Sequence, residues 1–180
     1  MKLKINDSTL EVIQGDITEQ NTEAIVNAAN NQLAPGGGVA GAIHRAAGPE
    51  LWEKCKKLGG CETGEAKITH GYNLPASHVI HTVGPVYSGA PEDPKLLTSC
   101  YRESLKLAEK NHIESISFPA ISTGAFGYPM EEAARVALRT IMNFLKQSEV
   151  SLVRLVLYDS KALKIHETVL KKMKHNPNEP

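Results

Sequence analysis

Residues 27–48 read NAANNQLAPGGGVAGAIHRAAG, and this stretch carries most of the information on fold and chemistry. Three consecutive glycines, Gly36 to Gly38, precede a run of helical composition that begins at Val39. Glycine lets a backbone adopt conformations closed to other residues and come close to a ligand. The unpaired N–H groups of a helix's first turn suit an anion such as phosphate. With the polar amides just upstream, the stretch predicts a pocket for a nucleotide diphosphate.

The composition bounds the class of protein. At 180 residues the chain fits one domain, which we expect to span residues 1–174, with the polar residues 175–180 as a flexible tail. Twenty basic and twenty acidic residues cancel and form no basic stripe, which argues against general nucleic-acid binding. The N-terminus has no long apolar core, so we expect neither a signal peptide nor a membrane span.

Three irregularly spaced cysteines favour reduced thiols over a disulfide framework. They therefore predict a cytoplasmic location. Nothing in the sequence requires more than a monomer.

Short apolar runs alternate with amphipathic stretches, a pattern typical of an α/β fold. We expect strands at residues 10–13, 24–27, 66–69, 79–83, 115–118 and 152–158. Helical stripes begin at Asp93-Pro94 and after Pro129, and a last helix is expected over residues 161–173. The pattern predicts a three-layer α/β/α sandwich with a mixed, mostly parallel sheet of about six or seven strands.

Four polar or glycine-bearing segments each follow an expected strand. They read GDIT, NAAN, STGAFGY and, after the last strand, YD. In open α/β sheets, ligands bind beyond the carboxyl ends of the strands. Four separate elements therefore point to one rim of the sheet.

A second glycine loop, PAISTGAFGYP at residues 119–129, holds Gly124 and Gly127 on either side of Phe126. Two such loops can clamp a diphosphate from opposite sides through their backbone N–H groups, with Phe126 against a sugar. Taken alone, this loop is equally well explained as a strand-to-helix turn with core aromatics. Its combination with the first glycine run favours the binding site.

Other readings of these motifs are weaker. Gly36, Gly38 and Gly41 match G-x-G-x-x-G, but a loop of about eight residues separates them from the strand, unlike a dinucleotide fingerprint. No G-x-S-x-G elbow surrounds Ser122, which argues against a hydrolase triad. His44 has no ligand partner at i+4 and is expected to be structural. We expect no metal site and no cofactor.

The sequence alone leaves the roles of two residues undecided. Asp16 in GDIT is either a helix N-cap, the commoner role, or a carboxylate that accepts a hydrogen bond from an exocyclic amine such as that of adenine. Tyr158 either stacks on a base or packs at the rim.

Taken together, these residues resemble a macrodomain, the ADP-ribose-binding fold. The similarity runs from Gly15 to Tyr158 and includes VNAAN, GGGV-x-GAIHRAAG, TGEAKIT, HTVGPVY and ISTGAFGYP in the family's order. The MacroD-type branch, whose members remove mono-ADP-ribose from proteins, is the nearest resemblance. It implies an enzyme that acts on mono-ADP-ribosylated acidic side chains, deacetylates O-acetyl-ADP-ribose, or does both, with ADP-ribose and modified proteins as partners.

The resemblance also implies roles for single residues. Asp16 would hold the adenine amine with the backbone of Ile17, Tyr158 would lie near adenine, and Asn30 would hold the distal ribose and be needed for hydrolysis. The two diphosphate loops would be formed by Gly37, Gly38 and Val39 and by Ser122, Thr123, Gly124, Ala125 and Phe126.

One position departs from the MacroD pattern. Those enzymes carry an aspartate after GGGV that is thought to position the attacking water, whereas this chain has Ala40. Viral macrodomains resemble the chain in GGGVAGA and still hydrolyse ADP-ribosyl esters. Ala40 is also the best support for the alternative function, a reader that binds ADP-ribose without turnover.

Overall fold

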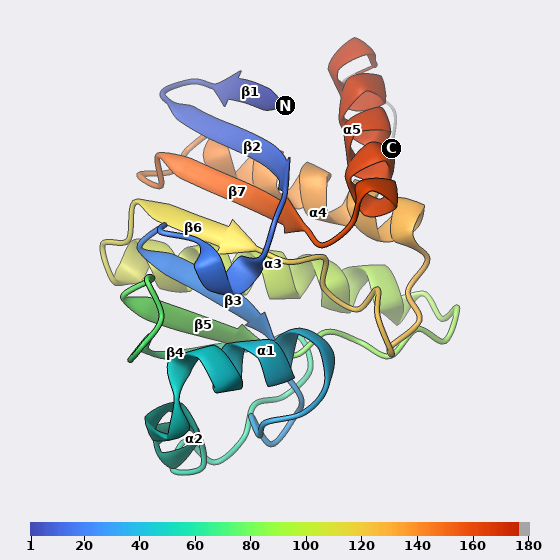
Figure 1. Ribbon diagram of the computed structural model, residues 1–180. Helices are drawn as coiled ribbons and strands as arrows, with labels where there is room; N and C mark the ends of the chain where they lie inside the picture. Colours follow the sequence, from blue (N-terminus) through green and yellow to red (C-terminus); the bar gives the residue numbers. More distant parts are fainter. Residues whose placement is uncertain (177–180) are drawn as a thin grey trace.

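Seven strands form one mixed sheet in the computed structural model of the chain, which describes residues 1–176 (Figure 1). The strand order is β1-β2-β7-β6-β3-β5-β4. The strands are β1 (Lys2–Ile5), β2 (Ser8–Gln14), β3 (Ala24–Ala28), β4 (Ala66–His70), β5 (His78–Thr82), β6 (Ser115–Phe118) and β7 (Leu152–Leu157).

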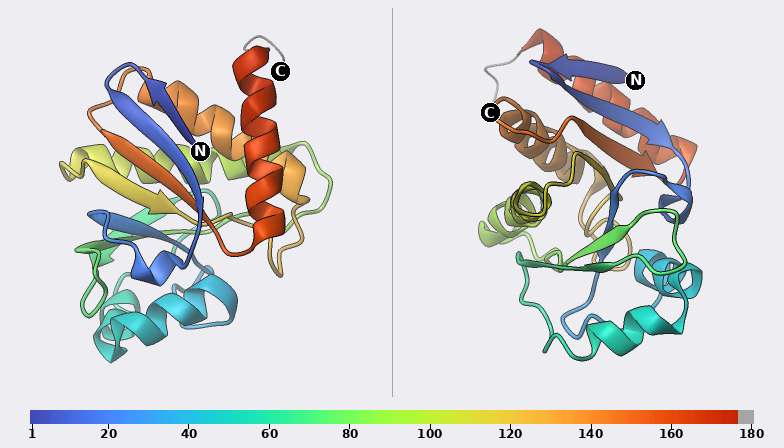
Figure 2. Two further views of the ribbon diagram at one scale, coloured as in Figure 1. Left: turned by 45° about the horizontal axis from the view of Figure 1, so that its top comes forward. Right: turned by 90° about the vertical axis from the view of Figure 1, so that its left-hand side faces the viewer.

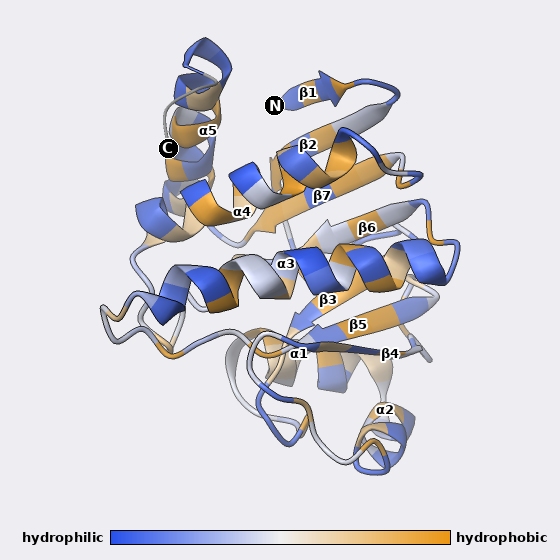
Figure 3. Cartoon of the chain, turned by 180° about the vertical axis from the view of Figure 1, so that it is seen from behind, coloured by the Kyte–Doolittle hydropathy of each residue, from blue (hydrophilic) through white to orange (hydrophobic). Residues whose placement is uncertain are grey.

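The five central strands are parallel, and the two edge strands, β1 and β4, are antiparallel to their neighbours. Parallel strands in the centre of a sheet are covered on both faces, which explains why β7 is an apolar run, LVRLVL (Figure 3). The carboxyl ends of these strands meet at one edge, as the sequence predicts for the site.

Helices cover both faces of the sheet and complete the predicted three layers (Figure 2). One face buries a core beneath η1, α1 and α2, and the other buries a larger core beneath α3, α4 and α5. The helices are η1 (Ile17–Glu19), α1 (Gly38–Ala47), α2 (Pro49–Cys55), α3 (Glu92–Lys110), α4 (Met130–Leu145) and α5 (Ser160–His175).

Most expected elements are confirmed, with small shifts at their ends. The helix expected from Asp93 is confirmed and begins one residue earlier, at Glu92. The expected cap role of Asp93 is wrong, because its carboxylate accepts from the segment before the helix. The last strand ends at Leu157, which leaves Tyr158 outside it. Of the expected tail, His175 instead ends α5, and residues 177–180 lie outside the described residues.

The edge strand β1 and the short helix α2 are additional to the expected elements. All three cysteines are buried and free. Within residues 1–176, no helix has the length and apolar character needed to cross a membrane.

Candidate functional site

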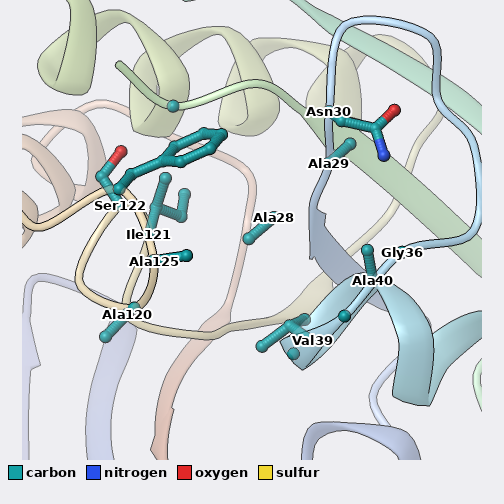
Figure 4. Close-up of a pocket in the computed structure, with 15 residues that line it drawn as sticks. Ala28, Ala29, Asn30, Gly36, Val39, Ala40, Ala120, Ile121, Ser122 and Ala125 are labelled. Carbon is teal, nitrogen blue, oxygen red and sulfur yellow. The ribbon is translucent and has the colours of Figure 1, made fainter. Parts of the chain in front are cut away.

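A cavity of about 310 Å³ opens at the carboxyl-end edge of the sheet (Figure 4). Its walls come from the end of β3, the start of α1, Gly84 shortly after β5 and the loop that follows β6. Its lining residues are Ala28, Ala29, Asn30, Gly36, Gly37, Gly38, Val39, Ala40, Gly84, Ala120, Ile121, Ser122, Gly124, Ala125 and Phe126.

The first glycine loop places the N-terminus of α1 at this cavity. The first hydrogen bond of the helix runs from the Gly41 N–H to the Gly37 carbonyl, at 3.1 Å. Within residues 1–176, the five N–H groups of residues 36–40 therefore have no protein acceptor. Gly38 has a φ of +54°, a left-handed conformation that favours glycine. The loop offers unpaired donors and the positive end of a helix dipole, which together suit a phosphate.

Asn30 holds the chain that leads into this loop. Its side-chain oxygen accepts the Ala34 N–H and its Nδ2 donates to the Ala34 carbonyl, both at 2.9 Å. A carboxamide has two donors and two acceptor lone pairs, so one N–H and one lone pair stay available to a ligand. Asn30 lies across the cavity from Ser122 (Figure 4). It therefore has a structural role in addition to the predicted contact with the ribose.

The second loop closes on itself and leaves its own donors free. The Ser122 carbonyl accepts the Tyr128 N–H at 2.9 Å, and the Gly124 carbonyl accepts the Gly127 N–H at 3.0 Å. The N–H groups of residues 122–126 have no acceptor within the described chain. Ser122 has a φ of +68°, and its buried Oγ has no hydrogen-bond partner in the protein. A buried unpaired hydroxyl at a cavity wall is available to a bound molecule.

Gly84 allows the two walls to approach each other. A Cβ at this position would overlap the Ser122 Oγ and lie 2.7 Å from Cγ2 of Ile121. Gly84 lines the cavity but was not among the predicted site residues. Its position directly after the expected strand 79–83, in HTVGPVY, is the signal by which the sequence could have revealed it.

A separate group of residues lies at the ends of β2 and β7. The Gly15 N–H donates to the Leu157 carbonyl at 2.9 Å, which brings Asp16 and Tyr158 onto neighbouring strand ends. Oδ1 of Asp16 accepts from the Thr18 N–H at 2.8 Å and the Thr18 hydroxyl at 2.7 Å. The N-cap role of Asp16 is therefore confirmed, while its Oδ2 has no hydrogen bond within the described residues.

The cavity itself contains no ionisable side chain among its lining residues. On α1, burial lowers the pKa of His44, and both its ring nitrogens are buried without a partner. No three His, Cys, Asp or Glu side chains within residues 1–176 lie close enough to hold a metal ion. The chemistry offered by the described cavity is that of backbone N–H groups, one amide and one hydroxyl.

Comparison with known proteins identifies this arrangement. The Macro domain model matches residues 26–137, from the middle of β3 through the first half of α4. The chain belongs to the Macro domain family. The matched segment contains both glycine loops and Gly84.

Several relatives of this macrodomain are named as enzymes of ADP-ribose chemistry. It is 49% identical over 176 residues to an O-acetyl-ADP-ribose deacetylase of Salmonella typhimurium, with 94% of this chain and 98% of the relative covered. It is 52% identical over 160 residues to the ADP-ribose glycohydrolase MACROD2 of Xenopus laevis, which covers 86% of this chain but 38% of the relative. A solved mutant of the Oceanobacillus iheyensis macrodomain with ADPR is 46% identical, with a TM-score of 0.95 and 97% and 98% of the two chains covered.

The macrodomain fold brings most of the predicted site residues to one cavity. These are Asn30, Gly37, Gly38, Val39, Ser122, Gly124, Ala125 and Phe126. Four others lie outside it: Asp16, Ile17, Thr123 and Tyr158.

The four residues outside the cavity differ in what they contact. The Ile17 side chain is buried in the core beneath α1, but its N–H has no acceptor within residues 1–176. The Thr123 hydroxyl donates to the Ala120 carbonyl at 3.0 Å, so it supports the loop from within. Tyr158 is 87% exposed, and Asp16 on the neighbouring strand end is exposed as well. An exposed strand-end site next to the cavity matches a long ligand with one end outside the cavity.

Proposed function

We propose that this macrodomain binds ADP-ribose and hydrolyses the ester that joins it to acidic side chains of proteins. One observation carries the proposal: two runs of five unpaired N–H groups, at residues 36–40 and 122–126, border one cavity without any ionisable side chain. Such donors suit a diphosphate. The adenosine half would extend to Asp16 and Tyr158, and the distal ribose would lie between Asn30 and Phe126.

In the proposed reaction, the bent diphosphate brings one of its oxygens to a water beside the distal anomeric carbon. The water attacks that carbon, the bond from the carbon to the acidic side chain breaks, and the side chain leaves as a carboxylate. The proton of the water passes to the phosphate oxygen that holds it and then to solvent. Asn30 orients the ribose through its remaining amide N–H. The rate gain comes from proximity and preorganised dipoles. A cavity lined by residues such as Val39 and Ala125 supplies no general base, which agrees with a reaction assisted by the substrate.

The names of the relatives support the same assignment. A deacetylase of O-acetyl-ADP-ribose and an ADP-ribose glycohydrolase both act on a bond to the distal ribose of ADP-ribose. We propose both ester types as substrates, since the same pocket serves each of them.

Ala40 supports a second candidate, a reader that binds ADP-ribose without turnover. Its methyl group lines the cavity at a position 6% exposed, where the MacroD pattern has an aspartate. Without a carboxylate there, water is held by the substrate alone.

The deciding experiment is release of ADP-ribose from a protein mono-ADP-ribosylated on acidic residues. Wild type should release it, and Asn30→Ala should lose at least about tenfold in rate. Asn30→Asp is the matched variant, because it keeps the oxygen that accepts the Ala34 N–H but loses the donor. Asn30→Asp also loses the hydrogen bond to the Ala34 carbonyl. Loss of activity in both variants therefore assigns the effect to the amide group, and an unchanged melting temperature of Asn30→Asp narrows it to the N–H that faces the cavity. Binding of ADP-ribose without release by wild type would favour the reader.

For the setting of this function we propose a monomer in the cytoplasm. Three free thiols fit a reducing compartment, and burial raises the pKa of Cys55 and Cys100 to about 11. Val86 and Tyr158 are the large apolar side chains that stand exposed in the described structure, and two isolated side chains do not make a dimer interface.

A further inference from the structure

Asp93, at the start of α3, is a buried carboxylate without a cation. It is 4% exposed, and no Lys or Arg within residues 1–176 forms an ion pair with it. Its Oδ2 accepts the N–H groups of Ser88 and Gly89, each at 2.9 Å, and both its oxygens lie 3.2 Å from the Ser88 hydroxyl. These hydrogen bonds lower the pKa of Asp93. A buried carboxylate therefore fixes the segment that immediately precedes the helix.

That segment, residues 84–91, joins the cavity wall to α3. Gly84 at its start lines the cavity. The Tyr87 ring packs on the Tyr128 ring, with centroids 5.0 Å apart, at the end of the second glycine loop. The Tyr87 N–H donates to the Phe126 carbonyl at 2.8 Å. In sequence, Tyr87 is directly followed by the two residues that Asp93 holds.

The bond to Phe126 stands out in the hydrogen bonding of the loop. The other hydrogen bonds of residues 122–128 in the described structure stay within the loop and its own flanks. The hydrogen bond from the Tyr87 N–H to the Phe126 carbonyl therefore ties this loop to the rest of the described protein. An ordered segment 84–91 therefore fixes the position of Phe126 and of the N–H groups of residues 122–126.

We propose that Asp93 is a positioning residue for the reaction, which acts through Tyr87 on the loop that carries Phe126. This proposal rests on the proposed function for its effect on ligands. Asp93 touches neither diphosphate nor ribose; it determines how well the second loop is preorganised to meet them. What the segment requires is an acceptor at the position of Oδ2, and a neutral carboxamide also supplies one, although its hydrogen bonds are weaker than those of a carboxylate.

The test compares Asp93→Ala, Asp93→Asn and Leu105→Ala by calorimetry with ADP-ribose and with AMP. Leu105 is fully buried on the same helix and controls for general loss of stability. Asp93→Ala should weaken ADP-ribose binding about tenfold, the effect of losing one to two net hydrogen bonds. AMP lacks the distal ribose, so it misses the part of the ligand that lies beside Phe126. The affinity of Asp93→Ala for AMP should therefore stay within about twofold of the wild-type affinity. Asp93→Asn should restore ADP-ribose binding. Leu105→Ala should leave the ratio of the affinities for ADP-ribose and AMP unchanged.

Amide hydrogen exchange in the free protein gives a readout that needs no ligand. Asp93→Ala should speed the exchange of the Tyr87, Ser88 and Gly89 amides, and Asp93→Asn should not. The proposal is overturned if Asp93→Ala keeps Tyr87 protected, if ADP-ribose and AMP affinities fall equally, or if Asp93→Asn behaves like Asp93→Ala. Failure of wild type to bind ADP-ribose would reject the proposed function, while exchange at Tyr87 would still decide the role of Asp93.

Discussion

Gly84→Ala tests whether close approach of the two cavity walls governs the site. The added Cβ would overlap the Ser122 Oγ and lie 2.7 Å from Cγ2 of Ile121, and both neighbours are buried. Gly84 has no left-handed φ, so the cost comes from the overlap and not from backbone strain. Overpacking of this kind costs about 1–3 kcal/mol.

This cost is partly offset, because alanine reduces the conformational entropy of the unfolded chain. Replacing glycine by alanine where the conformation allows it stabilises a protein by about 0.4–1 kcal/mol. We therefore expect a net loss of about 1–2 kcal/mol in the free energy of unfolding, or about 2–8 °C in melting temperature for a chain of this size. Affinity for ADP-ribose should fall as well, because relieving the overlap displaces the loop that carries Ser122.

Thermal unfolding and calorimetry measure both effects, with two matched variants. Gly124→Ala lies on the second loop, where a Cβ meets no atom within 4 Å, and should leave the melting temperature unchanged or slightly raised. Ser122→Ala removes the overlapped hydroxyl, so Gly84→Ala should cost less in that background, with a coupling of about 0.5–3 kcal/mol. Equal cost in both backgrounds, or a Gly84→Ala protein as stable as Gly124→Ala, would refute the reasoning.

Three further predictions concern binding, pH and rate. Asp16→Ala should weaken ADP-ribose binding by about 1.5–3 kcal/mol, the range for a hydrogen bond to a charged group, and unchanged affinity by calorimetry would leave Asp16 only its cap role. Burial lowers the pKa of His81 to about 3, so below its ordinary pKa of about 6.5 the unfolded chain binds a proton that the folded protein does not. The free energy of unfolding should therefore fall as the pH drops, by about 2 kcal/mol from this group between pH 7 and pH 5, and equal values in urea titrations at the two pH values would contradict it. Ala40→Asp should raise the rate of ADP-ribose release in a single-turnover assay, and an unchanged rate would show that water is not positioned from residue 40.

The sequence predicts the two glycine loops well because their function depends on local backbone chemistry. Three glycines at the start of a helix are visible in the chain itself, and glycine permits the left-handed φ that Gly38 adopts. The central strands were equally predictable, since a strand buried on both faces is a mostly apolar run, such as LVRLVL in β7. The half-exposed edge strand β1 and the seven-residue helix α2 carry too weak a pattern to stand out.

Contacts between distant segments could not be predicted in this way. The need for glycine at residue 84 arises from Ser122, nearly forty residues later in the chain. Asp93 has the sequence context of a helix cap, and only the fold shows that its carboxylate accepts from Ser88 and Gly89. The pairing of the Asn30 amide with Ala34 is local, but many asparagines have such neighbours without forming this clamp.

In the proposed function, unpaired N–H groups of two loops hold the diphosphate of ADP-ribose. An amide-resolved NMR titration of the wild-type protein with ADP-ribose tests it most directly, because it reports on each N–H separately. We predict that the largest shifts fall on the amides of residues 36–40 and 122–126, with smaller ones at Asp16 and Ile17. Saturable binding that leaves both runs unchanged and shifts amides elsewhere would contradict the account.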